Sequence, residues 1–202
     1  MIKKYAAAAA LVLLAACKAE NTSGEPETAT TVTTGQSIQE TGSATATTTG
    51  STGGTMSAMT PEDKEFVSDA GMDGLFEVQA GNLALQKASS AEVKSFAQRM
   101  VTDHGTANTE LGQLATTKGL ALPTELGGDA KTMYDHLNGL SGAEFDKSYM
   151  QHMVEGHNKD VAEFEKISTT GGDADLKTWA AKTLPTLQQH QQMAKDISSK
   201  LK

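Results

Sequence analysis

Apolar residues recur every three to four positions through most of the chain after residue 60, the spacing that puts them on one face of an α-helix. With the capping residues, this spacing predicts four long helices, over about 61–87, 90–118, 142–170 and 174–201, and a short one over 129–138. No stretch alternates with the period of two that is typical of a strand, and Val and Ile are scarce. The sequence therefore predicts an all-α four-helix bundle with short hairpin loops and a longer middle crossing that contains the short helix.

Residues that favour helix ends mark most of these boundaries. Thr60-Pro61-Glu62-Asp63 combines an N-cap, a proline at the first helical position and two acids in the first turn. Ser89-Ser-Ala-Glu92 and Ser141-Gly-Ala-Glu144 match the capping-box pattern, and Asp173 is an N-cap candidate for the last helix. Pro185 falls inside that helix, so we expect a bend or a loosened turn there.

The first 59 residues have a different character. Residues 1–16 combine a short basic start with an apolar run that is too short to span a membrane, which is typical of a secretory leader. The leader ends Leu14-Ala-Ala-Cys17, which resembles a bacterial lipobox, so Cys17, the only cysteine, is the expected lipidation site. Residues 17–59 are rich in Thr, Ser and Gly and are predicted to be a disordered tether, which leaves residues 60–202 for the bundle domain.

Charge and the leader together limit the partners and the location. Removing residues 1–16 leaves 15 basic and 25 acidic residues, a net charge of −10, without a basic cluster. Such a chain is a poor nucleic-acid binder, because neutralising phosphates requires Lys and Arg. We therefore expect no nucleic-acid partner and attachment to the membrane through the N-terminal lipid. Lys18 follows the cysteine where an aspartate would retain the protein at the inner membrane. We therefore expect a cell-envelope lipoprotein that faces the periplasm or the surface, with the outer membrane favoured if the cell has two membranes.

Each long helix has one ionisable residue near the centre of its apolar face. They are Glu77, His104, His157 and His190, and the two histidines in Met100-Val-Thr-Asp-His104 and Met153-Val-Glu-Gly-His157 occupy equivalent places. Counted from the hairpin loops, the members of each pair lie at similar heights, about four residues or roughly 6 Å apart along the axis. We therefore expect all four side chains to converge in the middle of the bundle.

Two interpretations of this convergence stay open. Three histidines and one carboxylate in an apolar core form a plausible mononuclear site for Zn, Cu or Fe, because imidazole suits these metals. Methionines one turn from the histidines (Met100, Met153 and Met193) are compatible with Cu(I). Alternatively, the histidines form a polar layer that bonds internally, with Glu77 or Asp103 holding the charge.

Several motifs resemble a bacterial family known as domain of unknown function 4142. Members are described as predicted outer-membrane proteins of the ferritin-like superfamily, so the resemblance implies a ferritin-like bundle but no established activity. It covers about residues 60–201 and rests on Glu77-Val-Gln-Ala-Gly81, Val93-Lys-Ser-Phe-Ala97, Met100-Val-Thr-Asp-His104, Phe145-Asp-Lys-Ser-Tyr149, Met153-Val-Glu-Gly-His157 and Leu184-Pro-Thr-Leu-Gln-Gln-His190.

The di-iron chemistry of some ferritin-like proteins does not carry over. Those proteins use a Glu on each of two helices and a Glu-x-x-His on each of the other two. Here Val101 and Leu187 stand three residues before His104 and His190, and His157 stands where the second lone Glu is expected. The carboxylates that bridge two irons are therefore missing, so we do not expect a di-iron oxidase or an iron store, and a mononuclear site rich in histidine stays open.

Three functions compete on this basis. In the first, the chain is a lipid-anchored envelope bundle that binds a metal ion. In the second, it is a structural or interaction module without a ligand. In the third, it is an enzyme that uses a mononuclear metal site. No nucleophile–base arrangement and no glycine-rich phosphate loop occurs in the sequence, which disfavours an enzyme.

Overall fold

The computed structural model describes residues 59–201, so the predictions for the leader, Cys17 and the tether fall outside the described residues. Within this range the chain forms five helices and no strand: α1 (Pro61–Lys87), α2 (Ala91–Thr117), α3 (Gly128–Asn138), α4 (Gly142–Thr170) and α5 (Ala174–Ser198). The all-α class and the five helices are confirmed, and every observed helix boundary lies within three residues of its prediction.

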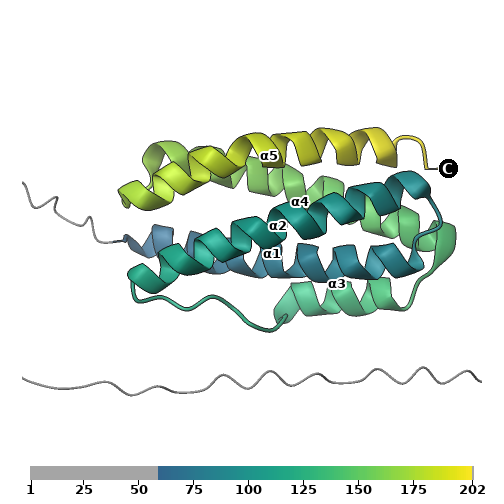
Figure 1. Ribbon diagram of the computed structural model, residues 1–202, viewed down its shortest axis with the longest axis horizontal. Coiled ribbons are helices and arrows are strands. Elements are labelled where there is room, and N and C mark those ends of the chain that lie inside the picture. The colour runs from purple at the N-terminus through teal and green to yellow at the C-terminus, as the bar shows by residue number, and fades with distance from the viewer. Residues whose placement is uncertain (1–58, 202) are drawn as a thin grey trace, which may run out of the picture. The chain divides into compact units, whose positions relative to one another are not determined.

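The four long helices pair as two hairpins, α1 with α2 and α4 with α5 (Figure 1). α1 also packs against α4, and α2 packs against α5, so α2 and α4 lie on a diagonal. The crossing between α2 and α4 runs the length of the bundle, and its short helix α3 packs on α1 and α4 (Figure 1). Every neighbouring pair of long helices is therefore antiparallel, as in ferritin-like bundles with one long crossover.

The apolar core consists of two clusters, one towards each end of the bundle. The larger cluster includes Phe96, Phe145 and Tyr149, and the smaller includes Phe66, Phe164 and Trp179. Neither contains the four ionisable residues expected at mid-bundle, which are buried all the same. The core is thus two hydrophobic layers with a polar layer in its middle.

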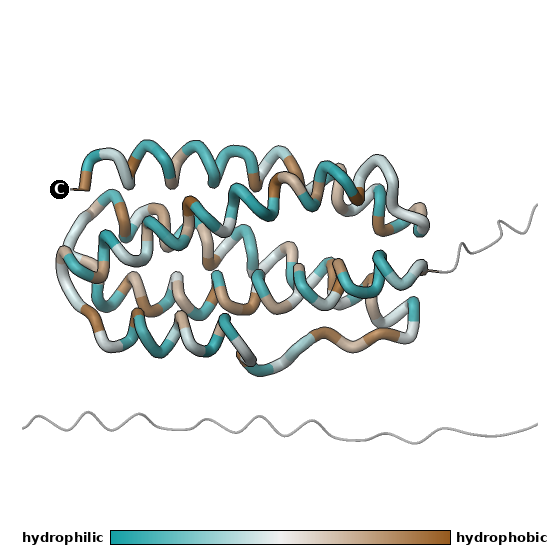
Figure 2. Tube along the Cα trace, turned by 180° about the vertical axis from the view of Figure 1, so that it is seen from behind, coloured by the Kyte–Doolittle hydropathy of each residue, from teal (hydrophilic) through white to brown (hydrophobic). Residues whose placement is uncertain are grey.

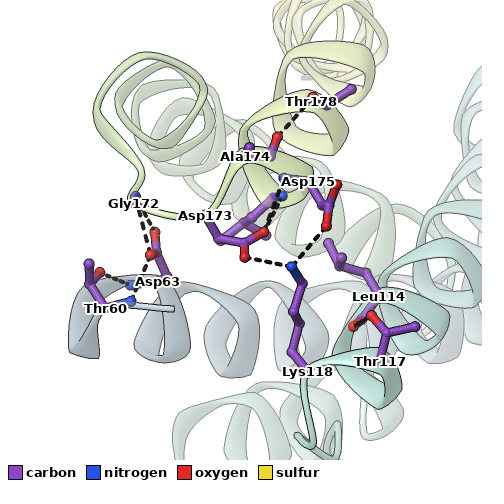
Figure 3. Close-up of polar contacts among 11 residues, drawn as sticks. Thr60, Asp63, Leu114, Thr117, Lys118, Gly172, Asp173, Ala174, Asp175 and Thr178 are labelled. Carbon is purple, nitrogen blue, oxygen red and sulfur yellow. Dashed lines mark hydrogen bonds and ion pairs between the residues drawn. The ribbon is translucent and has the colours of Figure 1, made fainter. Parts of the chain in front are cut away.

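One end of the bundle is held by two buried carboxylates (Figure 3). Thr60 and Asp63 form the capping box of α1, and the Asp63 carboxylate also accepts a hydrogen bond of 3.0 Å from the backbone N–H of Gly172, in the turn between α4 and α5. Asp173 caps α5 as predicted, and Lys118 at the end of α2 donates to it at 2.6 Å. These contacts join all four long helices at this end.

Two capping predictions were wrong. Ser90, not Ser89, caps α2, because the Ser89 hydroxyl donates to the Asp146 carboxylate on α4 instead. Ser141 is the N-cap residue of α4, but its side chain makes no capping hydrogen bond. The loosened turn at Pro185 is not seen either, since α5 is continuous from Ala174 to Ser198.

Hydrophobic positions are interspersed with hydrophilic ones along each long helix (Figure 2). Between residues 59 and 201, no helix has a stretch that is both long enough and apolar enough to cross a membrane.

Candidate metal centre

The polar layer contains one buried residue from each long helix. Glu77 comes from α1, His104 from α2, His157 from α4 and His190 from α5, and their exposed fractions are 5%, 6%, 0% and 0%. The two antiparallel hairpins therefore bring together the four side chains that the sequence singled out.

The distances within this layer are short. Nδ1 of His104 lies 2.6 Å from Oε2 of Glu77, and Nε2 of His157 lies 3.4 Å from Oε1 of the same carboxylate. The ring centroids of the three histidines are 5.2 to 5.6 Å apart. One potential ligand nitrogen from each histidine lies within 4.8 Å of the other two.

A hydrogen bond to an oxygen acceptor fixes the orientation of each imidazole. Nδ1 of His157 donates to the backbone carbonyl of Met153 at 2.9 Å, and Nε2 of His190 donates to Oδ2 of Asp103 at 2.9 Å. Nδ1 of His104 faces Glu77 in the same way. Since a carbonyl and a carboxylate only accept, the nitrogen that faces each of them carries the proton, and the other nitrogen of a neutral ring has a free lone pair.

Those other nitrogens are not hydrogen-bonded, although Nε2 of His157 lies 3.4 Å from Oε1 of Glu77. Nε2 of His104, Nε2 of His157 and Nδ1 of His190 are buried and make no hydrogen bond with any described residue. Metal-bound histidines in proteins typically bond a carboxylate or a backbone carbonyl through the nitrogen that does not bind the metal. Each of the three rings already has such a bond, so their lone pairs are free to bind a cation.

The electrostatics favour a cation in this layer. Burial lowers the pKa of His157 and lowers the pKa of His190 to about 4, so both rings are neutral at pH 7. Burial alone would raise the pKa of Glu77, but the neighbouring imidazoles of His104 and His157 outweigh it and lower the value to about 2. Glu77 is therefore an ionised, buried carboxylate that accepts from Nδ1 of His104 and lies 3.4 Å from Nε2 of His157.

The structure adds Asp160, which the apolar pattern of its helix did not single out. It is 7% exposed, and one of its oxygens lies within 4.8 Å of potential ligand atoms of Glu77 and His157. Its pKa is raised well above the usual range, because of burial and then the nearby carboxylates of Glu77 and Asp73. The available signal was its position three residues after His157, on the same face of the helix.

The methionines differ from one another. Met100 and Met153 are buried in the larger hydrophobic cluster, whereas Met193 is only partly buried. The Met193 sulfur lies 3.7 Å from the Arg99 guanidinium, which donates to it.

Fold and polar layer together define the class: a ferritin-like helical bundle of unknown function with a histidine group in its core that could hold a metal ion. The chain belongs to the family described as "Domain of unknown function (DUF4142)", which matches residues 48–197. The family resemblance found in the sequence is thereby confirmed. None of the curated proteins compared with this chain matches it in sequence.

Solved structures of similar fold have low sequence identity to the chain. The "DUF305 fragment from Deinococcus radiodurans" has a TM-score of 0.61 at 12% identity, over 71% of this chain and 99% of that one. "CopM in the Cu(I)-bound form" has a TM-score of 0.56 at 15% identity, over 66% and 93%. "CopM in the Cu(II)-bound form" has a TM-score of 0.55 at 16% identity, over 68% and 95%. At these identities the likeness establishes the fold alone.

Proposed function

We propose that this protein binds one transition-metal ion in the middle of its bundle. The ligands are Nε2 of His104, Nε2 of His157 and Nδ1 of His190, and the Glu77 carboxylate supplies a compensating negative charge. The observation that carries the proposal is the set of three buried, unpartnered ring nitrogens on three helices. A buried polar atom without a hydrogen bond is costly, and a metal ion would satisfy all three at once.

The donor set limits the ion. Imidazole nitrogens suit Zn, Cu and Fe, whereas Mg and Ca prefer oxygen ligands. Metal–nitrogen bonds of about 2.0–2.1 Å require the three nitrogens to lie closer together than 4.8 Å, so small side-chain rotations would accompany binding. CopM, which has a similar fold, is described in copper- and silver-bound forms, which makes copper the first ion to test.

A structural layer without a ligand is the second candidate. It is favoured by the close contact of Glu77 with His104 and by the hydrogen bond between Asp103 and His190, which need no metal. In such a layer these contacts would fix the register of the helices. This candidate gives no role to the three unpartnered nitrogens.

Titration of the full chain with metal separates the two candidates. The protein, purified without a chelator or a metal-affinity tag, is analysed for metal content and then titrated with Cu(II), Zn(II) and anaerobic Fe(II). We expect about one equivalent of bound metal per chain, with Cu(II) giving an electron paramagnetic resonance spectrum typical of nitrogen ligands. If none of the three ions binds, the metal proposal is wrong and the structural layer is the function of these histidines.

We further propose that the bundle is anchored to the cell envelope, most simply to the outer membrane, by a lipid on Cys17. The support is the lipobox-like end of the leader in the sequence. In cells fed radiolabelled palmitate, the wild-type chain is expected to carry the label and to fractionate with membranes. The Cys17→Ser variant is expected to lose the label and to leave the membrane fraction. Equal labelling of the two chains would contradict the anchor.

A further inference from the structure

A cavity of about 270 Å³ lies between α1 and α4, beside the histidine layer. Glu77 is part of its wall, together with Asp73, His152, Lys159 and Asp160. Because Glu77 also contacts His104, the cavity reaches the polar layer itself. A second hollow, of about 20 Å³, is lined by Asp73, Glu77, His104 and Asp160 among others and has room for about one water molecule.

Asp160 is the residue of this cavity that most needs an explanation. Its side chain is more than nine-tenths buried, and it makes no hydrogen bond or ion pair with any residue in the described range. It lies on the wall of both hollows, so it stands between the cavity and His104. A carboxyl group that borders the cavity and has no hydrogen bond to the protein is available to bind a cation there.

The neighbouring histidine points to the nature of that ligand. His157 has no exposed surface, and its Nε2 makes no hydrogen bond and lies 3.4 Å from Oε1 of Glu77. One potential ligand atom each of Glu77, His157 and Asp160 lie within 4.8 Å of one another. Two carboxylate oxygens and one imidazole nitrogen form a donor set for a divalent transition-metal cation.

We propose that the cavity between α1 and α4 is the port through which the metal ion enters, and that Glu77, His157 and Asp160 form a capture site on the way to the three histidines. This inference rests on the proposed function and adds the route. Glu77 and His157 belong to both sites, so the ion exchanges Asp160 for His104 and His190 without leaving the protein.

The order of donors along the route agrees with its direction. Asp73, at the cavity wall, is paired at 3.5 Å with the exposed Lys159. Further in, the ion meets Asp160 and Glu77, and last the histidine nitrogens. Carboxylates attract a hydrated cation, and imidazoles then replace its water with bonds that a transition metal favours. With several acids and a single lysine on the wall, the cavity disfavours anions.

The port is tested by the kinetics of Cu(II) binding to the full chain. Trp179, the only tryptophan, lines the smaller hollow beside His104, so its fluorescence quenching reports the arrival of Cu(II) in stopped flow. In Asp160→Asn, which keeps the shape but removes a carboxyl group that can ionise when the cation arrives, we expect the association and dissociation rates to fall together by about tenfold. The equilibrium constant is expected to change by less than about threefold, because a residue on the route affects both directions equally.

A second variant blocks the cavity without touching a proposed ligand. Gly156 lies on the cavity wall, and a Cβ added there meets no atom within 4 Å, so Gly156→Leu is accommodated and fills the opening. It is expected to slow both rates by at least tenfold. Gly105→Leu, at an equally open position on α2 away from the cavity, is the matched control, and Glu165→Gln is the control for charge on α4.

The possible results distinguish the port, the role of Asp160 and the proposed metal binding from one another. Rates in Asp160→Asn and Gly156→Leu that equal those of the two controls would overturn the port. A dissociation constant raised at least tenfold in Asp160→Asn, with unchanged association, would also overturn it and would make Asp160 a ligand of the final site. If the wild-type chain binds neither Cu(II) nor Zn(II), the proposed function itself fails, and the port fails with it.

Discussion

Replacing His157 by glutamine is expected to abolish stoichiometric metal binding. His157 is the one histidine of the layer whose ring is oriented by its own helix, through Met153. Its Nε2 lies 3.4 Å from Oε1 of Glu77, and its ring centroid lies 5.6 Å from that of His104 and 5.4 Å from that of His190. Losing a partner outside the ligand shell already costs about 10- to 100-fold in metal affinity, so losing a ligand is expected to cost more than about 100-fold. Competition with a chromophoric chelator measures the change.

The matched control for this variant is His136→Gln. His136 is exposed on α3, outside the polar layer, so its replacement removes an imidazole without affecting the candidate centre. Circular dichroism establishes that both variants keep their helices. Metal affinity that is equal in His157→Gln and in the wild type would rule out the three-histidine site.

The Asp146→Ala variant is expected to lose about 3 kcal/mol of unfolding free energy and to keep its metal affinity. The Asp146 carboxylate is 2% exposed and accepts hydrogen bonds from the backbone N–H of Ser89, the hydroxyl of Ser89 and the backbone N–H of Ser90. These bonds tie the turn between α1 and α2 to the first turns of α4. Alanine would leave three donors without an acceptor at a partly buried site.

Urea unfolding measures this loss, and Asp135→Ala is its control. Asp135 forms a surface ion pair with Lys131, and both side chains are 55% exposed, so its removal is expected to cost at most about 1 kcal/mol. Equal stabilities of the two variants would mean that Asp146 does not hold the hairpin turn to α4.

The sequence was sufficient for the helices and for the convergence of four residues at mid-bundle. Both follow from local periodicity and from counting residues away from the hairpin loops, and neither requires the contacts between helices. Glu77, His104, His157 and His190 stood out because each interrupts an apolar face. Whether they bind a metal stays a prediction.

The contacts that the sequence did not predict depend on how the helices are rotated and packed against one another. Ser89 matched a capping box, but Asp146, more than fifty residues away, competes for its hydroxyl, and no local pattern reveals that contact. Asp160 resembled the other acids of α4 in the sequence, and only the packing of α4 on α1 buries it beside Glu77. The free ring nitrogens likewise depend on acceptors such as Asp103 from another helix.

The polar layer is shared equally between the two hairpins. Glu77 and His104 belong to the hairpin of α1 and α2, and His157 and His190 to that of α4 and α5. The hairpins pack more extensively within themselves than against each other. An ion bound by residues of both hairpins would therefore stabilise the weaker interface between them. Amide hydrogen exchange at mid-bundle would slow in the metal-bound protein, and the two hairpins would unfold as one cooperative unit.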